Sequence, residues 1–217
     1  MKKRLFSLAL AALMATGAWA QENKVKFSIN AGPQWSPATG ATAGVDALIP
    51  FGQSRLGFEP GLYWSFRHYT SEKTQNGDKE KYDDKMHYLN VPLRFNVRMA
   101  GDADSPFNLS VFFGPYIAYG LDGTSRSTII KHGTYIQEVN TKTAAFGDNG
   151  RMESRFDYGL DMGLSAVVKQ HLKLRGFVEI GLKDIYRQNG FAEELIGDIF
   201  GITKINIGAG ITVGYQF

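Results

Sequence analysis

Two histidines, His68 and His87, bracket a polar stretch of the chain and are the first residues whose types suggest catalysis. A hydrolytic site needs a nucleophile, a base and a group that orients the base. The serines and aspartates close enough in sequence to complete such a set are Ser65, Ser71, Asp83 and Asp84. Histidines are also common amphipathic residues at an interface, and two of them without further placed ligands are weak evidence for a metal. We therefore expect neither catalysis nor a metal site here.

The elements that carry these residues follow from the pattern of apolar residues. In the last stretch, from Ile205 to Phe217, every second residue is apolar and the residues between are small or polar. Alternation of this length predicts a β-strand rather than a helix. The same period of two predicts further strands at residues 25–31, 43–49, 56–67, 89–99, 107–119, 156–168 and 172–183. Prolines inside three of these strands predict bulges or kinks at Pro60, Pro92 and Pro115.

The connections between these strands alternate in length. The short ones are residues 50–54, 101–106 and 169–171, and the long ones are 69–85, 122–155 and 184–203, with a modest first loop at 33–40. A membrane-spanning barrel has tight turns at one edge and longer external loops at the other. The sequence therefore predicts an all-β fold, an eight-stranded antiparallel transmembrane up-and-down β-barrel. Both termini of the chain are expected at the edge of the barrel that has the short turns.

Residues 1–20 have the features of an export signal. Basic residues at 2–4 precede an apolar run from Leu5 to Ala15, and a small-x-small cleavage site follows at residues 18–20. That run is shorter than the roughly 20 residues that cross a bilayer as a helix. We expect a signal peptide at 1–20 and a barrel domain at 21–217. The sequence has no cysteine, which excludes a lipoprotein anchor and disulfides.

Removing the leader changes the charge balance. The whole chain has 24 Lys and Arg against 21 Asp and Glu, and the leader holds three of the basic residues and none of the acidic ones. The remaining domain is formally neutral. This balance gives no case for a basic patch that would bind nucleic acid.

Charged residues gather on the side of the strands that would face the barrel lumen. They are balanced in sign and are Asp46, Glu59, Arg67, Arg94, Arg98, Asp157, Asp161, Arg175, Glu179 and Lys183. A barrel of about eight strands has an interior just wide enough for its side chains, so we expect these charges to pair and close the lumen. The alternative is a polar path for ions. Lys26 and Lys173 share the same parity, and we expect them at the rim, where water reaches them.

Four segments carry a family resemblance. They are Tyr-Leu-Asn-Val-Pro-Leu-Arg-Phe at 88–95, Phe-Phe-Gly-Pro-Tyr-Ile-Ala-Tyr at 112–119, Phe-Asp-Tyr-Gly-Leu-Asp-Met-Gly at 156–163 and Gly-Tyr-Gln-Phe at 214–217. Together they resemble the PorT-like outer-membrane β-barrel proteins of the Bacteroidota type. The resemblance implies an eight-stranded barrel inserted by the outer-membrane assembly machinery, which in such proteins reads a terminal strand with aromatic residues, here Tyr215 and Phe217. It implies no particular activity, and no residue here matches a role in secretion.

These observations favour a non-enzymatic outer-membrane protein with a structural or interaction role, and no cofactor. The expected partners are outer-membrane lipid, the assembly machinery and an unknown external partner, with no nucleic acid among them. Segment 122–155 is the best candidate for binding that partner, because loops longer than about 12–15 residues are usually functional or disordered. Its simpler interpretation is a solvated loop or an extension of the flanking strands. The functional alternatives are a narrow pore for ions or small solutes, and an outer-membrane lipid hydrolase.

Overall fold

The computed structural model describes residues 25–36, 38–75, 78–102, 105–132, 136–147, 152, 154–182 and 206–217. The predicted signal peptide, the predicted loop 184–203 and Lys183 lie outside these residues. None of the described residues belongs to a helix long and apolar enough to span a bilayer.

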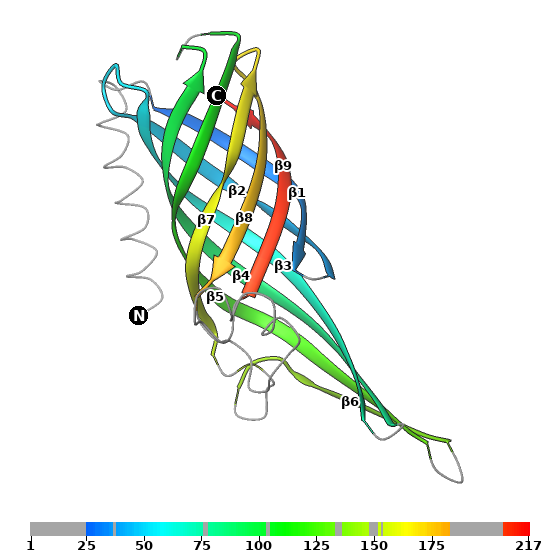
Figure 1. Ribbon diagram of the computed structural model, residues 1–217. Helices are drawn as coiled ribbons and strands as arrows, with labels where there is room; N and C mark the ends of the chain where they lie inside the picture. Colours follow the sequence, from blue (N-terminus) through cyan, green and yellow to red (C-terminus); the bar gives the residue numbers. More distant parts are fainter. Residues whose placement is uncertain are drawn as a thin grey trace.

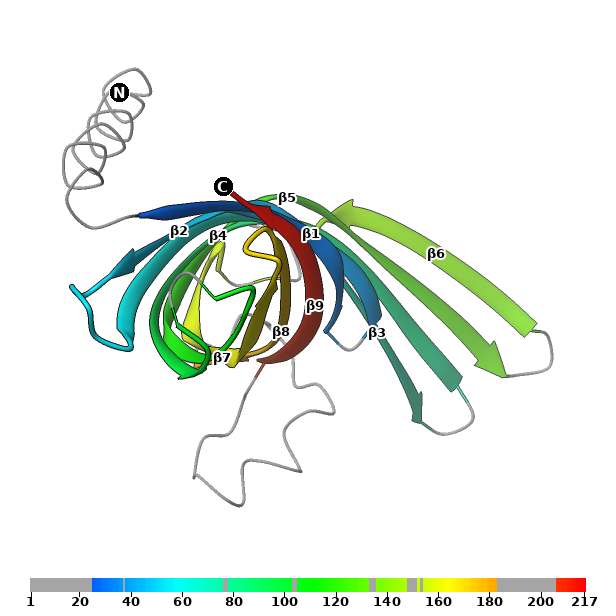
Figure 2. The same ribbon diagram turned by 90° about the horizontal axis from the view of Figure 1, so that it is seen from above.

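The described residues form nine strands, and every pairing between them is antiparallel. The strands are β1 Lys26–Ser36, β2 Ala38–Pro50, β3 Leu56–Gln75, β4 Asp78–Ala100, β5 Phe107–His132, β6 Ile136–Ala144, β7 Phe156–Val168, β8 Leu172–Gly181 and β9 Asn206–Gln216. All except β6 pair in a closed circuit, in which β5 pairs with β7 and β9 pairs with β1 (Figures 1 and 2). The strand β6 pairs with the C-terminal part of β5, residues 124–132.

The exposed faces of these strands distinguish the ring from a soluble sandwich. On β9, Ile211 and Val213 are 53% and 52% exposed, whereas Thr212 between them is 1% exposed. The same inversion holds on β1, where Ile29 is exposed while Ser28 and Asn30 are buried. An apolar exterior around a polar interior is the pattern of a barrel surrounded by lipid.

The prolines do not produce the bulges that the sequence predicts at Pro60, Pro92 and Pro115. The strand register is the same on both sides of each of these residues, so no residue is inserted there. The register shifts instead on the β4–β5 ladder, between His87 and Tyr88 and again near Arg98. The prediction of bulges was therefore wrong, whereas the alternative of local kinks stays a prediction.

Much of three predicted loops is strand. Residues 69–85 continue the β3–β4 ladder as far as the pair Gln75 and Asp78, and the predicted loop 33–40 is occupied by β1 and β2 up to the pair Ser36 and Ala38. In segment 122–155, β5 continues to His132 and β6 returns beside it. Figure 1 shows both long hairpins reaching well past the ends of the other strands. The apolar alternation fades there because both faces are polar, although main-chain pairing needs no apolar side chains.

Candidate functional site: the charged lumen and its cap

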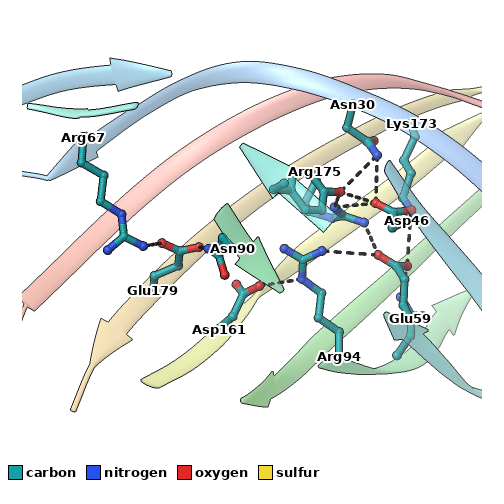
Figure 3. A network of polar contacts seen from close by, with 12 residues as sticks. Asn30, Asp46, Glu59, Arg67, Asn90, Arg94, Asp161, Lys173, Arg175 and Glu179 are labelled. Carbon is teal, nitrogen blue, oxygen red and sulfur yellow. Dashed lines mark hydrogen bonds and ion pairs between the residues drawn. The ribbon is translucent and has the colours of Figure 1, made fainter. Parts of the chain in front are cut away.

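The half of the lumen nearer the short turns holds a cluster of four charged side chains from β2, β3 and β8. Lys173 Nζ lies 2.8 Å from Asp46 Oδ1 and 3.3 Å from Glu59 Oε2. Arg175 Nη1 lies 3.0 Å from Asp46 Oδ2, and Arg175 Nη2 also contacts Glu59 (Figure 3). Lys173 and Arg175 reach the same cluster because alternate residues of a strand share a face. We call these four residues the lower cluster; Figure 1 draws this end of the barrel at the top.

Neutral side chains add hydrogen bonds to the lower cluster. Asn30 Nδ2 donates to Asp46 Oδ2 over 2.8 Å, and the hydroxyl of Tyr63 donates to the same carboxylate. Tyr63 in turn accepts from Arg175 Nη1 over 2.6 Å. Such bonds lower the cost of burying the charges.

A second cluster lies farther along the lumen, toward the long hairpins. Arg67 Nη1 lies 2.8 Å from Asp157 Oδ2, and Arg67 Nη2 lies 3.0 Å from Glu179 Oε2. Asn90 Nδ2 donates to the other oxygen of Glu179 over 2.6 Å. The guanidinium of Arg67 also stacks 4.7 Å from the centre of the Tyr88 ring. We call Arg67, Asn90, Asp157 and Glu179 the upper cluster.

Arg94 stands between the two clusters. Its Nε donates to Asp161 Oδ2 over 2.6 Å, and its Nη1 lies 3.9 Å from Glu59 of the lower cluster. The guanidinium lies 5.2 Å from the ring centres of both Tyr63 and Phe112. Charges and aromatic rings thus fill this section of the lumen together.

Eight of the predicted lumen residues point inward and are at most 7% exposed; they are Asp46, Glu59, Arg67, Arg94, Asp157, Asp161, Arg175 and Glu179. Arg98 is different, because it is only partly buried and pairs with no acidic side chain that the structure describes. Its backbone N–H donates to the carbonyl of Arg55 near the short turn. Lys183 is outside the described residues. Lys173 corrects the prediction of a rim residue, since it is 2% exposed at the centre of the lower cluster.

The histidine constellation is divided between the two faces of the β3–β4 hairpin. Ser65 is buried in the lumen, where its Oγ lies 3.4 Å from Thr42 Oγ1. His87 lies on the outer face and stacks on Trp64, with ring centres 5.6 Å apart. His68, also on the outer face, lies 3.3 Å from Asp83 Oδ1. Ser65 therefore does not face either histidine, and the described residues contain no group of three potential metal ligands.

Residues that the sequence analysis did not single out as a site cover the lumen at the end of the barrel from which the long hairpins extend. Phe146 and Met152 are 5% and 1% exposed, and Ala145 donates its N–H to Gly123 O over 2.9 Å. Ala145 also accepts a bond of 2.9 Å from the N–H of Met152. We call Ala145, Phe146, Met152 and Arg155 the mouth cap.

Phe146 is the central residue of the mouth cap. Its ring meets Tyr88 edge-on, with ring centres 5.7 Å apart, and Arg155 lies 5.1 Å from the ring centre on top of it. Arg155 Nη1 also donates to the carbonyls of Gly120 and Leu121, each over 3.0 Å. A side chain at Gly120 would overlap the Phe146 ring. The sequence signal for this contact was a lone phenylalanine in a polar segment.

A family comparison agrees with the closed antiparallel sheet. Residues 15–187 match the family model described as the outer membrane protein beta-barrel domain. The chain belongs to this family. The protein is therefore an antiparallel outer-membrane β-barrel, which explains its apolar exterior.

Solved structures similar to this outer-membrane β-barrel are distant in sequence. A major outer membrane protein from Thermus thermophilus is 15% identical, with a TM-score of 0.45 over 89% of this chain and 99% of that one. CarO of Acinetobacter baumannii is 15% identical, with a TM-score of 0.45 over 87% and 97%. The N-terminal β-barrel domain of Pseudomonas aeruginosa OprF is 11% identical, with a TM-score of 0.34 over 89% and 96%. No curated protein matches the chain, and likeness at this level assigns no activity to it.

Proposed function

We propose that this outer-membrane β-barrel is a closed, non-enzymatic interaction protein that presents its external hairpins to a partner. The observation that carries the closed state is the pairing of charges across the lumen at 2.6–3.0 Å, as in Arg94 with Asp161 and Arg175 with Asp46. A hydrated ion crossing this section would have to separate such pairs in a poorly solvated space, which is costly. The mouth cap adds an apolar layer above them.

We propose that eight strands of the protein, β1 to β5 and β7 to β9, span the membrane. These are the strands of the closed circuit of pairings, and β6 contributes only to the external extension of β5. The resemblance of residues 88–95 and 156–163 to PorT-like proteins supports the same strand number. We also propose that Tyr215 and Phe217, which are 50% and 65% exposed, are read by the assembly machinery.

The surface proposed for the external partner is the sheet formed by β3, β4, β5 and β6 beyond the barrel. Its hairpins are paired to their tips, up to Gln75 with Asp78 and His132 with Ile136. Paired strands present side chains in fixed positions, so a partner that binds them orders less chain than one that binds a loose loop. Figure 2 shows this extension projecting to one side of the ring.

Planar-bilayer recording of the purified barrel tests the closed state. We expect no discrete conductance steps from the wild-type protein. Reproducible steps would contradict the proposal and favour the narrow-pore alternative. A lipid A mass shift in cells that express the protein would contradict its non-enzymatic part.

Photo-crosslinking in intact cells tests the interaction role. A photoreactive residue at Val139 of β6, which is 40% exposed on the extension, should give a discrete protein adduct. The matched control is the same residue at Ile211, which is 53% exposed on the barrel wall and should react with lipid alone. Equal patterns at both positions would contradict the proposal.

A further inference from the structure

A small cavity lies between the lower and upper clusters, at the position of Arg94. The volume of the cavity is about 10 Å³, which is enough for about one water molecule. Its wall includes Arg175 of the lower cluster and Asn90 of the upper cluster, together with Arg94 and Thr212. Figure 3 shows the side chains of Arg175, Arg94 and Asn90 in this section of the lumen.

Each of these four residues has one buried polar atom without a hydrogen-bond partner among the described residues. The atoms are Arg94 Nη1, Arg175 Nε, Asn90 Oδ1 and Thr212 Oγ1. Arg94 Nη1 is 3.9 Å from Glu59, which is too long for a hydrogen bond. Native proteins rarely leave such atoms unpaired, and a group of them around one cavity points to a shared ligand.

The chemistry of the four atoms selects the ligand. The two guanidinium N–H groups can only donate, so the ligand must accept hydrogen bonds from them. Asn90 can only accept at this position, because its Nδ2 is held by Glu179 at 2.6 Å and its Oδ1 is the remaining atom. The ligand must therefore also donate. Thr212 can accept or donate.

The charged groups that line the cavity disfavour both an anion and a cation as its ligand. An anion would face Asn90 Oδ1 and the carboxylate of Glu179, which also lines the cavity. A cation would face two guanidinium groups. A neutral molecule that accepts two hydrogen bonds and donates two, in a space of this size, is water.

We propose that one water molecule is permanently bound in the lumen between Arg175, Arg94, Asn90 and Thr212. It accepts from the two arginines and donates to Asn90 and Thr212. Because Arg175 belongs to the lower cluster and Asn90 to the upper one, this water joins the two clusters into one hydrogen-bonded network. The inference rests on the geometry of the lumen and is independent of the proposed interaction role.

Two measurements on the intact barrel test the site. A crystal structure should show a density peak within hydrogen-bond distance of the four atoms. Oxygen-17 magnetic relaxation dispersion should count about one long-lived water fewer in Thr212→Ile, whose larger side chain enters the cavity, than in the wild type. Thr42→Val is the matched control, because Thr42 also lines the cavity but its hydroxyl already bonds to Trp64 O at 3.3 Å. It should keep the water.

Several results would overturn the proposal. They are an empty cavity in the wild-type crystal structure, an unchanged count of long-lived waters in Thr212→Ile, or a bromide peak at the same position after soaking, which would identify an anion site. If Thr212→Ile fails to assemble, the wild-type density and the bromide soak still decide the question.

Discussion

Arg67 on β3 and Asp157 on β7 are 90 positions apart in the sequence, and their side chains meet at 2.8 Å inside the barrel. The two strands are not neighbours in the sheet, so this ion pair spans the lumen rather than a ladder. The same guanidinium holds Glu179 on β8 at 3.0 Å. One arginine therefore ties three strands together from the inside.

Removing Arg67 should destabilise the barrel strongly. Arg67→Ala leaves two buried carboxylates without their cation, and breaking a buried pair in this way typically costs about 3–5 kcal/mol. The measurement is the temperature at which the protein loses its heat-modifiable gel mobility. Adding Asp157→Asn should recover part of the loss, because the orphaned charge is then neutral.

Arg98→Ala is the matched control for Arg67→Ala. Arg98 has the same side chain but is partly exposed and pairs with no acidic group that the structure describes. We expect a change within about 0.5 kcal/mol, as for an ordinary surface substitution. Equal losses from Arg67→Ala and Arg98→Ala would contradict the assigned network.

The lipid-facing side of β9 should reject charge according to depth. Ile211 lies in the middle of β9, and Ile211→Arg should cost about 2–4 kcal/mol if it is near the bilayer midplane. Ile207 lies one residue from the end of the strand, so Ile207→Arg should cost less. Unfolding titrations from lipid vesicles measure both. If both arginine variants are as stable as the wild type, the faces are assigned wrongly, and equal losses at the two positions would contradict the dependence on depth.

The inward face of β9 should reject even a methyl group at Gly210. A Cβ there would overlap the ring of Phe177, and forced overpacking typically costs about 1–3 kcal/mol. Gly176→Ala is the control, because a Cβ at Gly176 meets no atom within 4 Å. The gel-mobility assay should separate the two variants. If both behave like the wild type, the packing of Phe177 against β9 is wrong.

The mouth cap should open without releasing the barrel. Phe146→Ala removes the ring that Tyr88 and Arg155 hold, so trypsin should cleave after Arg155 several-fold faster, by local opening. The heat-modifiable transition should barely move, and conductance should stay absent because the charged clusters remain. Val139→Ala, an exposed change outside the cap, should leave cleavage unchanged. Conductance in Phe146→Ala would instead identify the cap as the main closure.

The sequence by itself determined the eight strands of the closed circuit and their faces. Alternation is a local property, so Ile211 and Thr212 could be assigned to opposite faces without knowledge of their neighbours. The same parity pointed Arg94, Asp161 and Arg175 inward. It could not anticipate that residues 69–85 continue as a paired hairpin, because polar residues on both faces leave no alternation to detect.

The tertiary structure alone decided which side chains meet. Partners across a lumen depend on the register of every ladder around the ring, and a shift such as the one near Arg98 is invisible in the pattern of any single strand. For this reason Lys173, predicted at the rim, lies buried between Asp46 and Glu59, whereas Arg98 lies apart. Phe146 reaches Tyr88 only because the chain returns to the barrel after β6, a contact set by folding in three dimensions rather than by any local period.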